Sequence, residues 1–427
     1  MKVLMFGWEF PPHITGGLGT ACFGLTKGMK KQGMDVIFVV PKAYGDENQE
    51  SIRIVNASDV EIDLRTKEYS SFINQITYIE VNSKLIPYVG EDDYYRLINE
   101  ESSGNFSYEK EISKRKYEFS GQYGTNLLLE IERYALVAAQ IAQDYDFDII
   151  HAHDWLTYKA GKAAKMVSNK PLVVHMHATE FDRSGQNINP LVFNIEREGM
   201  MAADRVVAVS NYTRNIVIEK HGIPADKVFT VHNAVEPNDK KDEKTYTKVL
   251  GEKIVTFLGR VTFQKGPEYF VEAAYKILQR DKNVRFVFAG DGDMMPKVIR
   301  RVAQLRIGDR FHFTGFLRGE EVDKMFGLSD VYVMPSVSEP FGISPLEAMR
   351  SNVPVVISKQ SGVSEVLQHA LKVDFWDVDA MANSIYGLLH YPALTQMCIE
   401  LGKEEVDNLL WENAAYKLKL IYQELLK

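Results

Sequence analysis

The chain has 427 residues, 45% of them hydrophobic and 25% charged, which is the composition of an ordinary globular protein long enough for two domains. Its formal net charge of −8 argues against non-specific nucleic-acid binding and gives no general attraction to anionic membranes. Two cysteines far apart in the chain, Cys22 and Cys398, exclude a disulfide framework or a cysteine-rich metal site and fit a reducing compartment.

The first residues, MKVLMFGWEFPP, carry one lysine and an apolar run that prolines interrupt, so they do not predict a signal peptide. No stretch approaches the ~20 apolar residues needed to span a bilayer. We therefore predict a cytoplasmic protein without a transmembrane segment.

The first half of the chain alternates short apolar runs with helical patterns. The runs are continuous, as in strands buried on both faces: KVLMFGW, DVIFVVP, DIIHAH, PLVVHMH, RVVAVS and KVFTVHN. Between the first two, residues 17–33 place Leu18, Cys22 and Leu25 at helical spacing. This βαβ beginning predicts a parallel, doubly wound, Rossmann-like α/β domain over residues 1–240.

Residues 42–123 break this alternation and are predicted to form an insertion. Its second part mixes acids with aromatic residues: Tyr88, Tyr94, Tyr95, Phe106, Tyr108, Tyr117, Phe119 and Tyr123. Such rings could line a carbohydrate groove, since insertions of this length in compact domains are often functional. An insertion with a small core of its own explains the pattern slightly better.

A polar stretch, Pro237 to Lys248, is predicted to link two domains. The runs beyond it predict a second doubly wound domain over residues 249–410: KIVTFLGR, VRFVFAGDG, RFHFTGF, DVYVMPS and VPVVISK. Residues 411–427 are predicted to form a helix that returns to the first domain. Two such domains leave a cleft between them, with ligands at the carboxyl ends of the strands.

A glycine-rich turn, HITGGLGT, follows the first predicted strand and opens the first predicted helix. Gly16 and Gly17 allow backbone amides to approach a ligand at the positive end of that helix. The turn matches neither GxGxxG, since Cys22 stands at the third glycine position, nor a P-loop, which needs Gly-Lys-Ser/Thr. A tight strand-to-helix turn explains these glycines about as well as an anion site.

Two cations follow the first strand of the second domain. Arg260 and Lys265 lie in GRVTFQKG, just before a helix, where positive charge is unfavourable unless an anion is present. A diphosphate would fit, because the Arg260 guanidinium can donate two parallel hydrogen bonds to phosphate oxygens and the Lys265 ammonium adds a compact positive charge. A later helix start, at Gly342, Ile343 and Ser344, offers a second positive end at the same sheet edge. For the two cations alone, a solvated surface pair is the alternative.

Two carboxylates flank that later helix start, in SEPFGISPLE. Pro340 and Gly342 argue against a continuous helix, so Glu339 is expected at the exposed exit of a strand, free to contact a ligand. Ser344 to Glu347 is typical of a capping box with proline at the first helical position, so Glu347 is expected to anchor its own helix.

Histidines cluster in HAHDW and VVHMHATE. Only alternate residues of a strand share a face, and no cysteine or regular carboxylate completes a ligand set, so no metal site is predicted. His151 and His175 are expected to be buried on strands with satisfied ring nitrogens. His177 and Asp154 fall at strand ends and are better candidates for contact with a ligand.

These motifs, in this order, resemble those of the retaining GT-B glycosyltransferases, near the border of family 4 and the glycogen and starch synthases of family 5. The resemblance runs nearly end to end through EFPPHITGGLG, HAHDW, VVHMHATE, SNYTRNIV, GRVTFQKG, AGDGDMMP, PSVSEPFGISPLEAM and SGVSEVL. It is most specific in GRVTFQKG and SEPFGISPLE. It implies two Rossmann-like domains that face each other across a cleft and a nucleotide-sugar donor.

The resemblance also implies a role for each candidate residue. By this resemblance, the residues that would bind the donor phosphates are Gly16, Gly17, Arg260, Lys265, Gly342, Ile343 and Ser344. Glu339 would contact sugar hydroxyls beside the anomeric carbon, and Glu347 would hold the ribose. His177 would contact the transferred sugar and Asp154 a sugar on the acceptor side. The implied catalytic residues are Glu339, Arg260, Lys265 and His177, with no metal or other cofactor.

Two departures, Ile14 in place of a lysine and Glu347 in place of a tyrosine, favour family 4, whereas HAHDW and FSGQYGTN favour the glucan synthases. We therefore predict a glycogen synthase-like enzyme that moves glucose from UDP- or ADP-glucose to an α-1,4-glucan. The alternative is a family 4 enzyme with a small-molecule or lipid-linked acceptor. An enzyme that binds a membrane surface would need a basic amphipathic patch, for which Lys27, Lys30 and Lys31 are candidates. A solvated helix face explains these lysines better.

Two other functions are disfavoured. A nicotinamide oxidoreductase would need GxGxxG and an acidic residue closing the second strand. A catalytically silent, glycan-binding relative would not need Arg260, Lys265, Glu339 and Glu347 intact.

Overall fold

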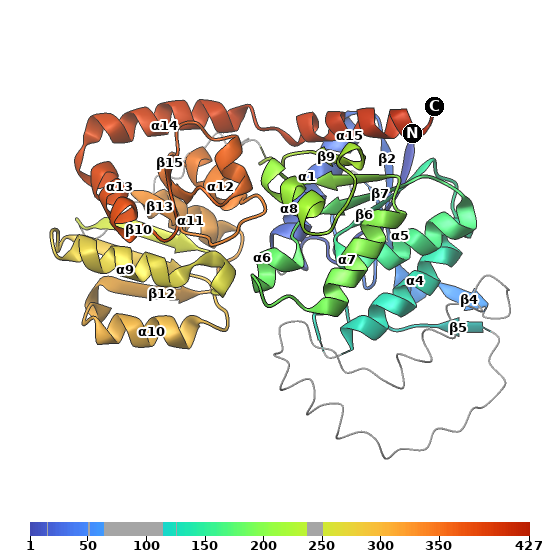
Figure 1. Cartoon of the computed structure of the whole chain (residues 1–427), viewed down its shortest axis with the longest axis horizontal. Coiled ribbons are helices and arrows are strands. Elements are labelled where there is room, and N and C mark those ends of the chain that lie inside the picture. Colours follow the sequence, from blue (N-terminus) through green and yellow to red (C-terminus); the bar gives the residue numbers. More distant parts are fainter. Residues whose placement is uncertain (15, 50–51, 64–113, 125, 237–250) are drawn as a thin grey trace, which may run out of the picture.

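The computed structural model describes residues 1–14, 16–49, 52–63, 114–124, 126–236 and 251–427, and it contains two α/β domains that lie side by side (Figure 1). Each domain is built on one parallel sheet, as the continuous apolar runs predicted. The predicted linker, Pro237 to Lys248, lies outside the described residues.

The N-terminal sheet has the strand order β3-β2-β1-β6-β7-β8-β9, and all its pairings are parallel. The order reverses between β1 and β6, so helices cover both faces and separate apolar clusters fill the two layers. The strands are β1 (Lys2–Phe6), β2 (Asp35–Val40), β3 (Arg53–Asn56), β6 (Ile149–His153), β7 (Leu172–Met176), β8 (Arg205–Ala208) and β9 (Val228–Thr230). The helices are α1 (Gly17–Lys31), α4 (Leu127–Asp144), α5 (Trp155–Ser168), α6 (Glu180–Ser184), α7 (Pro190–Ala202) and α8 (Asn211–Glu219).

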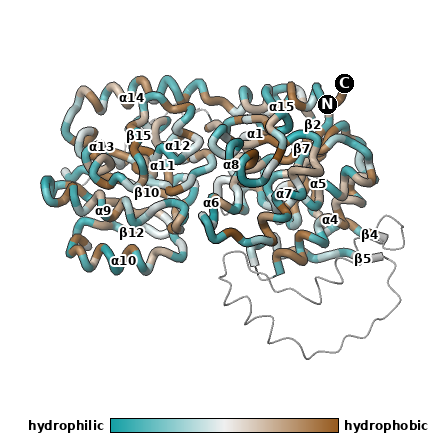
Figure 2. Tube along the Cα trace, viewed as in Figure 1, coloured by the Kyte–Doolittle hydropathy of each residue, from teal (hydrophilic) through white to brown (hydrophobic). Residues whose placement is uncertain are grey.

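The C-terminal sheet repeats this topology with the order β12-β11-β10-β13-β14-β15. Its strands are β10 (Lys253–Leu258), β11 (Val284–Ala289), β12 (Phe311–Gly315), β13 (Val331–Met334), β14 (Val355–Ser358) and β15 (Leu371–Val373). Its helices are α9 (Pro267–Leu278), α10 (Met295–Gln304), α11 (Glu320–Leu328), α12 (Ser344–Arg350), α13 (Val378–His390) and α14 (Pro392–Asp407). Figure 2 shows hydrophilic and hydrophobic residues alternating along α10 and α14, as expected for helices that cover a sheet with one face.

The last helix, α15 (Trp411–Leu425), lies against α1 of the N-terminal domain (Figure 1). Trp411 and Tyr422 are buried in the same apolar cluster as α1. Small residues on α1 permit this close approach, since a Cβ on Gly24 would lie 2.2 Å from Trp411 Nε1. The chain therefore crosses between the domains twice, and α15 completes the core of the first one.

The part of the predicted insertion from 64 to 113 lies outside the described residues, and Tyr88, Tyr94, Tyr95, Phe106 and Tyr108 lie there. Tyr117 and Phe119 are buried and join the N-terminal core, where Phe119 meets Tyr134 at 6.0 Å between ring centroids. These two rings therefore do not line a carbohydrate groove. A short antiparallel pair, β4 (Glu61–Asp63) and β5 (Lys114–Lys116), flanks the gap.

The three lysines of α1 that were candidates for a membrane-facing patch each pair with an acid. Lys27 lies 3.1 Å from Glu236, Lys30 lies 3.9 Å from Asp35, and Lys31 pairs with Glu412. Within the described residues, no helix has the length and apolar character to cross a bilayer.

Candidate active site

The candidate residues gather where the carboxyl ends of the two sheets meet. The glycine turn follows β1, and Arg260 follows β10 of the other domain. A Cβ added to Gly16 would lie 3.2 Å from Arg260 Nη2, so the guanidinium faces the glycine turn across the domain boundary. Gly17 is the first residue of α1. The exposed Arg260 and the start of α1 are thus close enough to act on one anion.

Lys265 forms an ion pair with Glu339. Lys265 Nζ lies 2.5 Å from Glu339 Oε2, and Ser336 Oγ donates to the same oxygen at 3.1 Å. Glu339 is only 6% exposed, so the expectation of a free carboxylate at an exposed strand exit is wrong. The cause is a left-handed turn at Gly266, with a φ of 62°, which brings the Lys265 loop against Pro335 after β13.

Glu347, the second carboxylate, does not form the capping box that the sequence predicts. Among the described residues no side chain caps α12, whose N-cap is Ile343 and whose first residue is Ser344, so the capping-box prediction is wrong. Burial raises the pKa of Glu347. Gly342 adopts a φ of 98°, which turns the chain from the Glu339 loop into α12. Glu347 is therefore available for a ligand, whereas Glu339 already has a cation.

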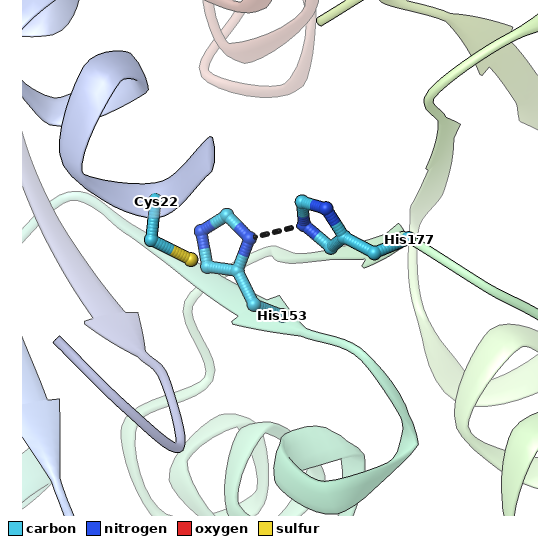
Figure 3. A group of neighbouring side chains, drawn as sticks. All are labelled: Cys22, His153 and His177. Carbon is cyan, nitrogen blue, oxygen red and sulfur yellow. Dashed lines mark hydrogen bonds between the residues drawn. The ribbon is translucent and has the colours of Figure 1, made fainter. Parts of the chain in front are cut away.

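His177 and Asp154 lie at the strand ends where the sequence placed them. His177 follows β7, and burial lowers its pKa to about 3, so the ring is neutral at physiological pH. His153 Nδ1 and His177 Nε2 share a hydrogen bond of 2.9 Å (Figure 3). A neutral ring here can contact sugar hydroxyls without adding positive charge.

Asp154 has an unusual backbone conformation, with φ 63° and ψ 166°, at the start of α5. Such strain costs about 1–3 kcal/mol and is concentrated at functional sites. Burial raises the pKa of Asp154 to about 6, although Arg183, 3.8 Å away, opposes the shift. Asp154 is thus a strained, buried carboxyl at the edge of the N-terminal sheet.

His151 and His175 are buried, as predicted, but their ring nitrogens are not all satisfied. His151 Nδ1 pairs with the Tyr422 hydroxyl. Within the described part of the chain, His151 Nε2 and both nitrogens of His175 have no hydrogen-bond partner. The four histidines stack along β6 and β7, with ring centroids 4.4 to 5.3 Å apart between neighbours.

This stack predicts loss of stability in mild acid. Burial lowers the pKa of each stacked histidine below the ordinary value of about 6.5, so acid protonates the unfolded chain first. Stability is complete above about pH 6.5, and each histidine should remove about 1 kcal/mol between pH 6.5 and 5.5. The raised pKa of Asp154 has the opposite effect, because acid protonates this carboxyl in the folded chain first. Its gain in stability over this pH range is smaller than the loss from one histidine. Urea unfolding at both pH values tests this, and equal stability would contradict it.

Sequence reasoning missed a set of contacts that joins the two domains beside Glu339. Ser338 Oγ donates to the buried Asp182 at 2.5 Å and lies 2.9 Å from the Tyr212 hydroxyl. Ser210 Oγ donates to Pro340 O at 2.5 Å. Glu365 accepts from the Asn211 and Tyr212 amides at the start of α8, at 2.9 and 2.6 Å. We call Asp182, Ser210, Tyr212, Ser338 and Glu365 the interdomain clamp.

The clamp needs a glycine at position 362. A Cβ there would lie 2.2 Å from Pro340 O and 2.4 Å from Ser210 Cβ. Gly362→Ala should therefore push the Glu339 loop away from α8 and lower kcat/KM by up to about 10²-fold through misplacement of the catalytic groups. Gly308→Ala is the control, because its Cβ would meet nothing within 4 Å. Equal kcat/KM in both variants would show that the clamp does not position the site.

Comparison with known families agrees with this geometry. Residues 238–405 match the model for "Glycosyl transferases group 1", and residues 108–239 match the model for "Glycosyltransferase Family 4". The two matches overlap at residues 238–239 and together include all five residues of the interdomain clamp and the Arg260, Lys265 and Glu339 loops.

Curated relatives carry different names. An uncharacterised glycosyltransferase of Methanocaldococcus jannaschii is 28% identical, covering 99% of this chain and 98% of its own length. An alpha-D-kanosaminyltransferase of Streptomyces kanamyceticus is 27% identical over 54% of this chain and 64% of its own length. A glycogen synthase of Mycobacterium tuberculosis is 22% identical over 99% of this chain and 94% of its own length.

Among solved structures, a sucrose-phosphate synthase from Thermosynechococcus elongatus superposes with a TM-score of 0.71 at 17% identity. The match covers 99% of this chain and 98% of that one, and it supports the two-domain fold. The chain therefore belongs to the group 1, family 4 glycosyltransferases with the GT-B fold.

Proposed function

We propose that this glycosyltransferase moves glucose from UDP- or ADP-glucose to an α-1,4-glucan with retention of the anomeric configuration, as a glycogen synthase does. The observation that carries the proposal is that Arg260 faces the start of α1 across the domain boundary, while Lys265, five residues further along the same loop, pairs with Glu339. Two cations from one domain and a helix end from the other suit a diphosphate between the sheets.

The cations and helix ends would stabilise the leaving group. Cleavage of the bond between the anomeric carbon and the phosphate oxygen builds negative charge on the diphosphate and positive charge on the sugar ring. Arg260, Lys265 and residues 342–344 are preorganised for the first charge. Because these groups supply the positive charge, the mechanism requires no metal or other cofactor.

The ion pair between Lys265 and Glu339 would change partners when the donor binds. The diphosphate attracts Lys265 Nζ, which leaves the Glu339 carboxylate to accept hydrogen bonds from sugar hydroxyls beside the anomeric carbon. Ser336 still donates to that carboxylate and holds it in place. In this proposal Lys265 balances the negative charge of Glu339 until the donor binds.

The remaining residues would position the two substrates. The neutral His177 contacts the transferred sugar, and Asp154 contacts a sugar on the acceptor side. The buried Glu347 holds the ribose hydroxyls. The acceptor hydroxyl attacks the face that the leaving phosphate vacates, and a phosphate oxygen takes its proton, so no covalent enzyme intermediate is required.

The acceptor has one specific alternative. The likeness to a glycogen synthase runs along nearly the whole chain, which favours a glucan. The likeness to a 2-deoxystreptamine glucosyltransferase of Streptomyces kanamyceticus, 25% identical over 55% of this chain, favours a small-molecule acceptor. The pairing of Lys27, Lys30 and Lys31 with acids gives no support to a lipid-linked acceptor.

A donor panel tests the proposal. We expect release of nucleoside diphosphate from UDP- or ADP-glucose that rises when glycogen is added. If glycogen does not change this release but free sugars or aminocyclitols increase it, the enzyme belongs to the class with small-molecule acceptors. No release from any UDP-, ADP- or GDP-sugar, with either kind of acceptor, would contradict the proposed chemistry.

A further inference from the structure

A cysteine from α1 lies beside the histidines at the ends of β6 and β7. Cys22, His153 and His177 each offer a ligand atom within 4.8 Å of the other two (Figure 3). The sequence argument against a metal site, that no cysteine completes the set, is therefore wrong for these residues, because the fold brings Cys22 next to a residue 131 positions further along the chain. One thiol and two imidazoles are the ligand types that Zn²⁺ and similar ions prefer.

The same group contains one buried nitrogen atom that has no partner among the described residues. His153 is 0% exposed, and its Nε2 has no hydrogen-bond partner within the described residues. The hydrogen bond to His177 uses the other nitrogen, Nδ1. Because a buried, unsatisfied nitrogen costs about 1–3 kcal/mol, a cation that binds it removes a penalty already present in the fold.

The charges around the group also suit a cation. The imidazoles are neutral, which is the form that binds a metal, because burial lowers the pKa of His153 and of His177. Burial raises the pKa of the Cys22 thiol, with further contributions from the nearby carboxylates of Glu9 and Asp154. Those carboxylates disfavour a bare thiolate but attract a dication.

Access distinguishes this group from the neighbouring one. His151, His153 and His175 also lie within ligand distance of one another, but all three are enclosed. His177, after the end of β7, is of intermediate exposure, so the Cys22 group includes one ligand that is not fully enclosed. With bond lengths of about 2.0–2.3 Å, the ligand atoms of one ion lie within about 4.4 Å of one another, which is close to the 4.8 Å limit that the three side chains satisfy.

We propose that Cys22, His153 and His177 bind a thiophilic divalent cation of the Zn²⁺ type, and that the bound ion inhibits the enzyme. On binding, the Cys22 S–H bond breaks, a sulfur–metal bond forms and the proton leaves to solvent, with no change of oxidation state. The inhibition rests on the proposed role of His177, because the ion takes the imidazole away from the donor sugar. The binding itself does not depend on that role.

Cobalt binding tests the site directly. The full chain, freed of metal with a chelator, is titrated with Co²⁺, and the thiolate-to-cobalt charge-transfer band is recorded in the near ultraviolet. Since the chain has two cysteines, Cys398→Ala is the matched control and should keep the band, whereas Cys22→Ala should lose it. Should the alanine variant fail to fold, Cys22→Ser replaces it. No band in the wild-type chain, or a band that survives the change at Cys22, would overturn the site.

Zinc inhibition tests the consequence. Zn²⁺ should stop release of nucleoside diphosphate by the wild-type chain, and a chelator should restore it. Cys22→Ala should turn over normally and need at least about tenfold more Zn²⁺ for the same inhibition. Equal inhibition of both proteins would refute the inhibitory role. If the chain turns over no nucleotide sugar, the proposed function fails, and the cobalt spectrum still decides whether the cation site exists.

Discussion

Replacing Arg260 or Lys265 with alanine should lower the rate of donor cleavage about 10²–10³-fold, because each is a preorganised charge on the leaving diphosphate. The measurement is kcat for release of nucleoside diphosphate at saturating donor. Lys276→Ala is the control, since Lys276 is exposed and pairs with an exposed aspartate, Asp379, on α13. A loss in the control as large as in the two variants, or no loss in any of them, would contradict the assignment.

The two variants should differ in stability. Lys265→Ala leaves the buried Glu339 carboxylate without its cation, which should lower the free energy of unfolding by up to about 3 kcal/mol. Arg260→Ala removes an exposed side chain and should leave stability unchanged. Urea unfolding separates these cases. Equal stability of the two variants would show that the ion pair is not a structural element.

Glu339→Gln should lower turnover about 10²-fold while sparing nucleotide affinity. The amide keeps the shape of the side chain and can still accept from Ser336, but it cannot stabilise positive charge on the sugar ring. It also releases Lys265, so nucleoside diphosphate should bind as tightly as before or more tightly. Calorimetric titration with UDP or ADP and turnover with the matching sugar nucleotide give the two quantities. Wild-type turnover would remove Glu339 from the mechanism.

The sheets could be predicted from the sequence because parallel strands buried on both faces are continuous apolar runs. The principal strands of both domains lie in the predicted runs. The sequence did not reveal β3, β4, β5 and β15, which are short. Of these, β3 and β15 lie at sheet edges, where apolar runs are weaker, and β4 and β5 form a separate two-stranded sheet. The fold class therefore followed from local patterns.

The arrangement of the two carboxylates could not be predicted in the same way. The sequence showed that Glu339 follows a strand and that Glu347 is in a helix, but it did not show what lies beside them. Lys265 is 74 residues from Glu339 and pairs with it only because the turn at Gly266 brings two loops together. Local rules therefore predicted a capping contact for Glu347 that is absent from the described part of the chain, and they predicted no partner for Glu339, which pairs with Lys265.

The interdomain clamp and the cysteine beside the histidines were missed for the same reason. Asp182 and Ser338 are 156 residues apart. Cys22 lies on α1, 131 positions before His153. One signal was available, since SEPFG and SGVSEVL were both recognised as family motifs. Their contact through Glu339 and Gly362 depends on tertiary structure.

Lengthening of glycogen outer chains by labelled glucose is the most direct test of the central claim, that this site cleaves a nucleotide sugar and extends a glucan. With the preferred donor of the panel, we predict incorporation of α-linked glucose that tracks nucleoside diphosphate release and falls in step with it in Glu339→Gln. Release without incorporation, or incorporation that Glu339→Gln leaves unchanged, would contradict that claim.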